Sequence, residues 1–102
     1  MMKMPFLTLA LSAGLALSAM AAAPPLLGSQ YLSRAKVSPA RAQLVATAVV
    51  HGTVISRELE REKGGSGLRY SFDIRLGNVV HEVGIDAITG LVLENSIDDG
   101  SD

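Results

Sequence analysis

Residues 68–76, LRYSFDIRL, decide the fold, because large apolar side chains alternate with charged or hydroxyl-bearing side chains along the whole stretch. Successive side chains of a strand point to opposite faces of a sheet. The alternation therefore predicts a strand that is buried on one face and wet on the other. Such a strand needs other apolar elements to cover its buried face. The apolar members are Leu68, Tyr70, Phe72, Ile74 and Leu76.

The same pattern continues on both sides of this segment. Gly77-Asn78 is typical of a tight hairpin turn and predicts that a second strand follows directly. Glycine-rich and Asp-containing stretches bound two more alternating segments, one upstream and one downstream. The expected strands are residues 53–62, 68–76, 79–85 and 91–95, separated by turns at 63–67, 77–78 and 86–90.

Ahead of the strands, the spacing of the apolar residues is helical. Ser38 can cap the first N–H groups of a helix, and Pro39 suits its first position because the missing N–H is not needed there. Gly52 is expected to end the helix as a left-handed cap, which gives a length of about 14 residues. The apolar stripe of this helix is Ala42, Val45, Ala46 and Val49.

These elements predict an α+β domain with one N-terminal helix packed on a three- to four-stranded antiparallel sheet. A domain of this size buries only about 60% of the surface of its unfolded chain, which leaves little room for a deep catalytic cleft. The expected core is Ala42, Val45, Ala46, Val49, Ile55, Leu59, Tyr70, Phe72, Ile74, Val83, Ile85 and Val92.

The two ends of the chain are expected to lie outside this domain. Residues 1–21 carry Lys3, an apolar run and small residues, the layout of a secretory signal peptide cleaved after Ala21. The alternative is an uncleaved N-terminal anchor. The processed chain is expected in the periplasm or secreted, with no membrane insertion after signal cleavage. The other divisions are a spacer at 22–36, the folded domain at 37–95 and an acidic disordered tail at 96–102.

Composition excludes several classes of function. The 102 residues include 9 Lys+Arg and 10 Asp+Glu, so the formal net charge is -1. Nucleic acids and anionic membrane surfaces select basic patches, so neither is expected as a partner. The sequence contains no Cys, which excludes a disulfide framework, a thiol nucleophile and a Cys-type zinc site. No cofactor is expected.

The two histidines raise the question of a metal site. His51 falls at the end of the expected helix, where a cation is favoured by the helix dipole, and His81 falls at an inward strand position. They show no HxxxH or HxxE spacing, and a metal site would need Glu82 or Asp73 to complete it. The sequence therefore favours structural roles for both, and whether either binds a metal stays open.

The acidic and hydroxyl residues could suggest calcium binding or nucleophilic catalysis, but the sequence favours neither. Glu58, Glu60 and Glu62 alternate along one strand face, as in a row of calcium ligands, but basic residues stand between them. That mixture indicates a solvated face or a protected edge. No GxSxG motif is present, and neither Ser66 nor Ser71 has an evident base. The sequence therefore predicts no enzymatic activity.

Binding has a clearer physical route. If the strands pair in sequence order, residues 53–62 and 91–95 form the two sheet edges, and an exposed edge can accept a partner strand by main-chain hydrogen bonding. The alternative is that residues 24–36 cover the 91–95 edge. The candidate partner-binding residues at this edge and on the outward face are Leu91, Leu93, Arg69, Asp73 and Arg75.

The order of elements in the chain is the helix, Gly52, the charged strand, YSFDI at 70–74 and HEVGIDAITGLVL at 81–93. This arrangement resembles a PepSY domain over about residues 37–94. The chain departs from that family at Leu91, where a Lys is usual, and no peptidase domain follows. In this stretch Asp86 can accept hydrogen bonds from the N–H groups of Ile88 or Thr89, and Gly90 can adopt the positive φ that closes the turn. Asp86, Thr89 and Gly90 are therefore expected to be a structural turn motif.

PepSY domains occur in propeptides of secreted metallopeptidases and in small exported proteins. The resemblance implies an exported, non-catalytic binding domain that inhibits or restrains a secreted or envelope peptidase. One alternative is an envelope sensor or ligand-binding module without peptidase contact. A second is a weak metal-binding periplasmic protein. The sequence leaves the partner, the sign of the regulation and the oligomeric state open.

Overall fold

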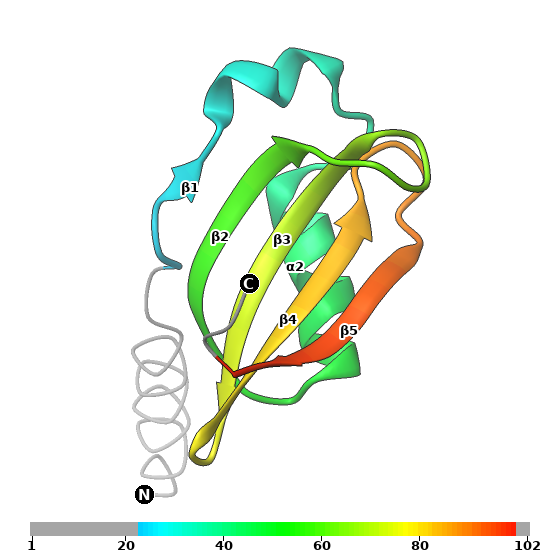
Figure 1. Cartoon of the computed structure of the whole chain (residues 1–102). Helices are drawn as coiled ribbons and strands as arrows, with labels where there is room; N and C mark the ends of the chain where they lie inside the picture. The colour runs from blue at the N-terminus through cyan, green and yellow to red at the C-terminus, as the bar shows by residue number, and fades with distance from the viewer. Residues whose placement is uncertain (1–22, 100–102) are drawn as a thin grey trace, which may run out of the picture.

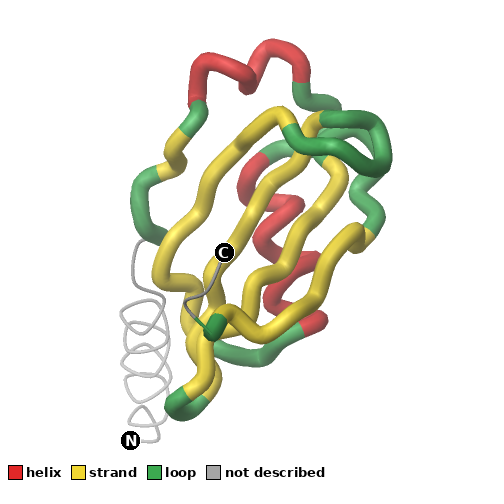
Figure 2. The backbone as a smooth tube through the Cα atoms, viewed as in Figure 1, coloured by secondary structure: helices red, strands yellow, loops and turns green. Residues whose placement is uncertain are grey.

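The computed structural model describes residues 23–99, so the predicted signal peptide at 1–21 lies outside the described part. One sheet in the order β1-β2-β3-β4-β5 carries helix α2 on one face, and no helix within residues 23–99 covers the other face (Figures 1 and 2). We call this second side the open face. The elements are β1 (Leu26–Leu27), a 3-10 helix η1 (Ser29–Arg34), α2 (Pro39–Val49), β2 (Thr53–Arg61), β3 (Leu68–Leu76), β4 (Val79–Asp86) and β5 (Val92–Asp98).

The predicted fold class is wrong in three respects. The sheet has five strands, it is mixed because β1 runs parallel to β2, and the helix α2 lies in the middle of the chain, after β1 and η1, rather than at its start. The strands β2 to β5 pair antiparallel in sequence order. The error came from the region 22–36, which was predicted as a spacer although its described part contains β1 and η1.

This segment is ordered because it docks along β2. Leu26 pairs with Arg57, whose Nε also donates a hydrogen bond of 2.7 Å to the Pro24 carbonyl. Gly28 has φ 80, and a Cβ at this position would lie 1.9 Å from the carbonyl oxygen of Leu59. Only glycine permits this approach, so Gly28 lets the chain turn closely over the β2 edge. Tyr31 of η1 then packs against the hydrophobic core.

Helix α2 begins as predicted and ends earlier than predicted. The Ser38 side chain accepts a hydrogen bond of 3.1 Å from the Arg41 N–H, and Pro39 is the first helical residue. The helix ends at Val49, and Val50 is already extended with φ -125, so Gly52 is not the left-handed cap. Gly52 is required for another reason, because a Cβ there would lie 2.2 Å from the carbonyl oxygen of Arg75.

The core forms between α2 and the sheet face of Leu59, Tyr70, Phe72, Ile74, Val83 and Ile85, all of them 0% exposed. Full burial of one such side chain contributes roughly 1.5–3 kcal/mol. Ala42 and Ala46 are also 0% exposed, so the helix approaches the sheet through its small residues. Tyr70 donates a hydrogen bond of 2.6 Å to the Val37 carbonyl, which satisfies its hydroxyl.

Three predicted core residues are exposed instead: Val49 at 39%, Ile55 at 36% and Val92 at 44%. Ile55 is displaced by an irregularity of the β2–β3 register, since Val54 pairs with Ile74 whereas Ser56 pairs with Asp73. An extra residue of this kind breaks the two-residue alternation. Val45, also predicted, is only partly buried. The core members that were missed are Val50, Leu68 and Ala87.

The C-terminal strand is longer than predicted. β5 continues through Ser96, Ile97 and Asp98, which were expected to belong to a disordered tail. Ser96 pairs with Glu82 and Ile97 with His81, so the polar composition of this segment reflects an edge strand rather than disorder. Within residues 23–99, no helix is long and apolar enough to cross a membrane.

Candidate functional site: the β5 edge and the open face

The outer edge of β5, here called the β5 edge, is the sheet edge along which no other described strand pairs. At the opposite edge, β1 pairs with Arg57 and Glu58 of β2. The alternative in which residues 24–36 cover the 91–95 edge is therefore wrong, because these residues lie on the other side of the sheet (Figure 1).

Apolar side chains accompany the β5 edge. Leu91 is 64% exposed, Ile97 is 63% exposed and Val92 is exposed as well. Leu93 is half-buried and lies against the β2–β3 loop, where its Cδ1 atom would be 2.9 Å from a Cβ at Gly65. Of the two predicted contact residues, Leu91 is thus available to a partner, whereas Leu93 is engaged within the domain.

The predicted polar residues of the outward face lie on the open face but have different surroundings. Arg75 is exposed, and Asp73 is half-buried and accepts a hydrogen bond of 2.9 Å from the Ser56 hydroxyl. Arg69 is only 9% exposed. Its guanidinium donates to Glu94 Oε1 at 3.1 Å and to the Lys63 carbonyl at 3.2 Å.

Arg69 therefore holds β5 and the β2–β3 loop to the sheet and is not available to a partner. Gly84 makes room for it, because a Cβ at Gly84 would lie 3.0 Å from Arg69 Cδ. The Nε of Arg69 has no hydrogen-bond partner among the described residues. Sequence reasoning missed this burial, since an arginine that alternates with apolar residues is typical of a solvated face.

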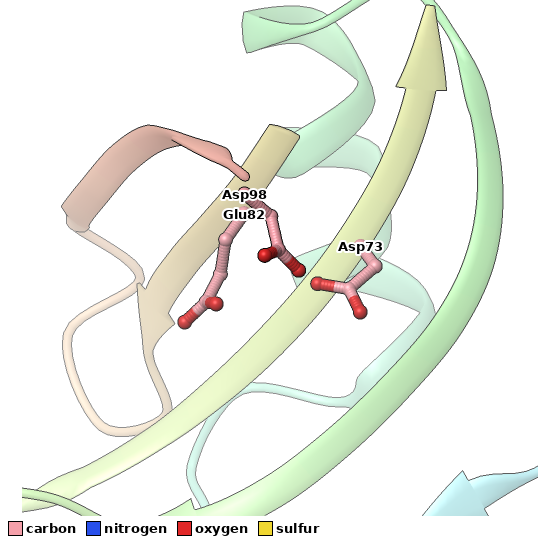
Figure 3. A group of neighbouring side chains, drawn as sticks. All are labelled: Asp73, Glu82 and Asp98. Carbon is pink, nitrogen blue, oxygen red and sulfur yellow. The ribbon is translucent and has the colours of Figure 1, made fainter. Parts of the chain in front are cut away.

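Carboxylates gather on the open face next to β5. Asp73, Glu82 and Asp98, from β3, β4 and β5, each place an oxygen atom within 4.8 Å of the others (Figure 3). Burial raises the pKa of Glu82, and the negative charges of Glu94 and Asp73 raise it further. Three strands therefore bring carboxylates together on this face.

A second acidic group lies farther from β5 on the same face. Glu58, Glu60 and Glu62 line a hollow of about 230 Å³ together with Glu82. Burial raises the pKa of Glu60, and the neighbouring Glu58 and Glu62 add to the effect, although the Ser71 hydroxyl donates a hydrogen bond to its carboxylate. The sequence predicted that the row of Glu58, Glu60 and Glu62 is a solvated face. In the structure this row adjoins Asp73 and Glu82, so the two acidic groups form one surface.

Oxygen atoms of this kind are ligands that hard cations accept. Asp73, Glu82 and Asp98 offer three carboxylates, whereas Ca²⁺ takes six to eight oxygen ligands. Water would have to complete such a site. The sequence named Asp73 and Glu82 only as helpers of a histidine site and did not find Asp98, because the three residues come together only through the register of three strands.

The two histidines lie on the helix side of the sheet. His51 and His81 both line a hollow of about 480 Å³ at the end of α2, together with Leu76 and Ile97. His51 Nε2 lies 3.0 Å from the Ala48 carbonyl, which fits its expected role at the helix C-terminus. Neither histidine belongs to the carboxylate group of the open face, because His81 and Glu82 project to opposite faces of β4.

The turn motif has more partners than the sequence predicts. Asp86 Oδ1 accepts hydrogen bonds from Ile88 N at 2.8 Å and Thr89 N at 3.0 Å, and Gly90 has φ 80. Ser66, in the β2–β3 loop, adds two more donors. Burial alone would raise the pKa of Asp86, but these hydrogen bonds outweigh it and lower the pKa to about 2. The motif is therefore a structural clamp between two loops.

Comparison with known proteins adds no relative. No protein-family model matches the chain, and no curated protein or solved structure is significantly similar to it. The resemblance to PepSY domains remains a prediction from the sequence.

Proposed function

We propose that this chain is an exported, non-catalytic binding domain, similar to PepSY domains, that restrains a peptidase of the cell envelope. Binding takes place by addition of an extended segment of the partner to the β5 edge. The observation that carries the proposal is that β5 forms the sheet edge while β1 occupies part of the β2 edge. An edge of this kind provides main-chain donors and acceptors for a partner strand.

The exposed apolar residues Leu91, Val92 and Ile97 support this proposal. The unpaired edge of a sheet is usually protected by charged side chains, whereas these apolar residues leave the β5 edge open to a partner strand. The resemblance supplies the class of partner, a secreted or envelope peptidase.

The direct test is to add the chain to a purified secreted metallopeptidase and to measure the rate of peptide hydrolysis. The proposal predicts a slower rate that depends on the concentration of the chain. A matched variant, Val92→Pro, weakens the effect if β5 is the contact, whereas Leu27→Lys at the opposite edge leaves it unchanged. Because proline could also disturb β5 itself, melting curves of both variants accompany the assay.

The two alternatives give other results in the same set of experiments. An envelope sensor or ligand-binding module leaves hydrolysis unchanged, and its melting temperature rises with an envelope component. A weak metal-binding protein is stabilised by calcium or zinc, and EDTA reverses the shift. The carboxylates of Asp73, Glu82 and Asp98 are the residues on which such a metal effect would depend.

A further inference from the structure

We propose that the segment received by the β5 edge is an extended stretch of a second protein in which Lys or Arg residues alternate with apolar residues. The inference rests on the proposed function in one respect, because it assumes that β5 pairs with a partner strand. It adds the chemistry of that strand, which follows from the two different surfaces that border β5.

A strand added beside β5 presents its side chains alternately to the two faces of the sheet. One set lies on the helix side, next to the residues of β5 that project there. The other set lies on the open face. Because the register of a strand is fixed by which side chains fit on each face, the two surfaces together select a sequence pattern with a period of two.

The helix-side surface carries exposed apolar side chains next to the polar side chains of His51, His81 and Asn95. Ile97 is 63% exposed, and it borders the hollow of about 480 Å³ that is also lined by Val49 and Leu76, both of them exposed. Val92 is 44% exposed and lies on the same side of the sheet, because it pairs with Ile85, whose side chain faces the core. Apolar side chains of an added strand would remove this surface from water, which favours association.

The open-face surface is acidic. Glu82 lies one strand away from the edge and pairs with Ser96 of β5, and the carboxylates of Asp73 and Asp98 approach it (Figure 3). Carboxylate oxygens of these three residues lie within 4.8 Å of one another and repel each other, so an added positive charge would relieve repulsion there. Lys or Arg side chains are long enough to reach across β5 to these carboxylates.

A second copy of the chain fits this surface poorly. Antiparallel pairing of two β5 strands is related by a two-fold axis perpendicular to the sheet, so the open faces of both copies would lie on the same side. The carboxylates of Glu82 and Asp98 in one copy would then adjoin those of the other, and like charges across an interface oppose association. Charge complementarity therefore points to a different, basic partner segment.

The test uses three synthetic eight-residue peptides and the full chain, with binding measured by fluorescence anisotropy. The first peptide alternates lysine and valine, the second alternates glutamate and valine, and the third contains the lysines and valines of the first in two separate blocks. We expect the first to bind more tightly than the other two by at least about tenfold, with an affinity that falls as salt is added.

Two variants with matched controls locate the contacts. Glu82→Gln weakens binding of the lysine–valine peptide by about twofold to fivefold, which is the range for partly exposed ion pairs. Glu58→Gln, on the same face but in β2, leaves it unchanged. Ile97→Ser weakens binding by removing apolar contact, whereas Leu44→Ser, an equally exposed position on α2, does not.

Three results would overturn the inference. The first is equal binding of the glutamate–valine peptide, and the second is equal binding of the block peptide. The third is self-association of the chain through β5, abolished by Ile97→Ser. The first result would leave the proposed function intact, since β5 would still receive a strand. If no peptide binds and peptidase hydrolysis is also unchanged, the proposed function itself fails.

Discussion

The carboxylate of Asp86, at the end of β4, holds Ser66 of the β2–β3 loop, 20 positions earlier in the chain, through two hydrogen bonds. The Ser66 N–H donates to Oδ2 at 2.7 Å and its hydroxyl donates to Oδ1 at 2.8 Å. Asp86 is 1% exposed and accepts two further hydrogen bonds from its own turn. This carboxylate therefore joins the two loops at one end of the sheet, and that end leads directly into β5.

The first prediction concerns the pH dependence of stability. The pKa of Asp86 is lowered from 3.8 to about 2 in the fold, so the unfolded chain binds this proton more readily. The stabilisation is complete above the unfolded pKa and is lost as the pH falls through the folded pKa. We expect the free energy of unfolding to fall by about 2 kcal/mol between pH 5 and pH 1 because of this group. Urea unfolding at several pH values measures it.

Asp86→Asn provides the control for this pH effect. The amide retains one acceptor oxygen for the three hydrogen bonds to Oδ1, but the Ser66 N–H, which donates to Oδ2, then faces an NH2 group. Loss of this hydrogen bond and of the carboxylate charge should cost about 1–3 kcal/mol at neutral pH. The variant should also show a shallower loss of stability in acid. If its stability fell in acid as steeply as that of the parent chain, Asp86 would not be the group that titrates.

The second prediction concerns the glycine that borders this clamp. Gly65 has φ 54, and a Cβ there would lie 2.3 Å from Asp86 Oδ2. Gly65→Ala should therefore lower the free energy of unfolding by about 1 kcal/mol, because alanine is strained in the left-handed conformation. It should lower it further because the added Cβ displaces the Asp86 carboxylate. Thermal unfolding of the variant measures the sum.

Gly77→Ala is the matched control, because Gly77 has φ 64 and no atom within 4 Å of an added Cβ. It should cost the conformational strain alone. The double variant Gly65→Ala/Asp86→Asn should lose less stability than the two single variants together, because both act on one contact. Equal losses for Gly65→Ala and Gly77→Ala would contradict the close approach of the two loops.

The third prediction concerns the acidic open face. The pKa of Glu82 is raised by burial and by the charges of Glu94 and Asp73, so its ionised form is disfavoured in the fold. The resulting penalty is absent at low pH, where the group is protonated in both states, and it appears as the pH rises above the ordinary value of 4.5. Glu82→Gln should therefore stabilise the chain at neutral pH by a few tenths of a kcal/mol, since the site is partly exposed.

Denaturant midpoints at pH 7 and pH 3 measure this effect. The gain from Glu82→Gln should disappear at the lower pH and should shrink at high salt, which screens the neighbouring charges. An equal gain at both pH values would mean that the effect comes from packing rather than from charge.

Local patterns in the sequence were sufficient to predict the paired strands and the start of the helix. The alternation at 68–76 and the Ser38-Pro39 start depend on neighbouring residues, and the structure contains a strand at Leu68–Leu76 and a helix that starts at Pro39. Sequential pairing of these strands follows from short turns such as Gly77-Asn78. Such features are fixed by backbone conformations that a few adjacent residues determine.

Features that depend on distant contacts were missed. β1 exists because Leu26 meets Arg57 and because Gly28 approaches Leu59, and no local pattern records either contact. The irregular register at Ile55 moves an apolar residue out of the core. The acidic group of the open face likewise depends on the register of three strands. The contacts of β1 decide which edge of the sheet is occupied.

Backbone hydrogen exchange along β5, measured with and without the lysine–valine peptide, tests the central claim most directly. If β5 receives the partner strand, amides on the outer edge of residues 92–98 exchange rapidly in the free chain and become protected in the complex, whereas the amides of β2 do not change. Protection confined to β2 or α2, with β5 unchanged, would contradict the account.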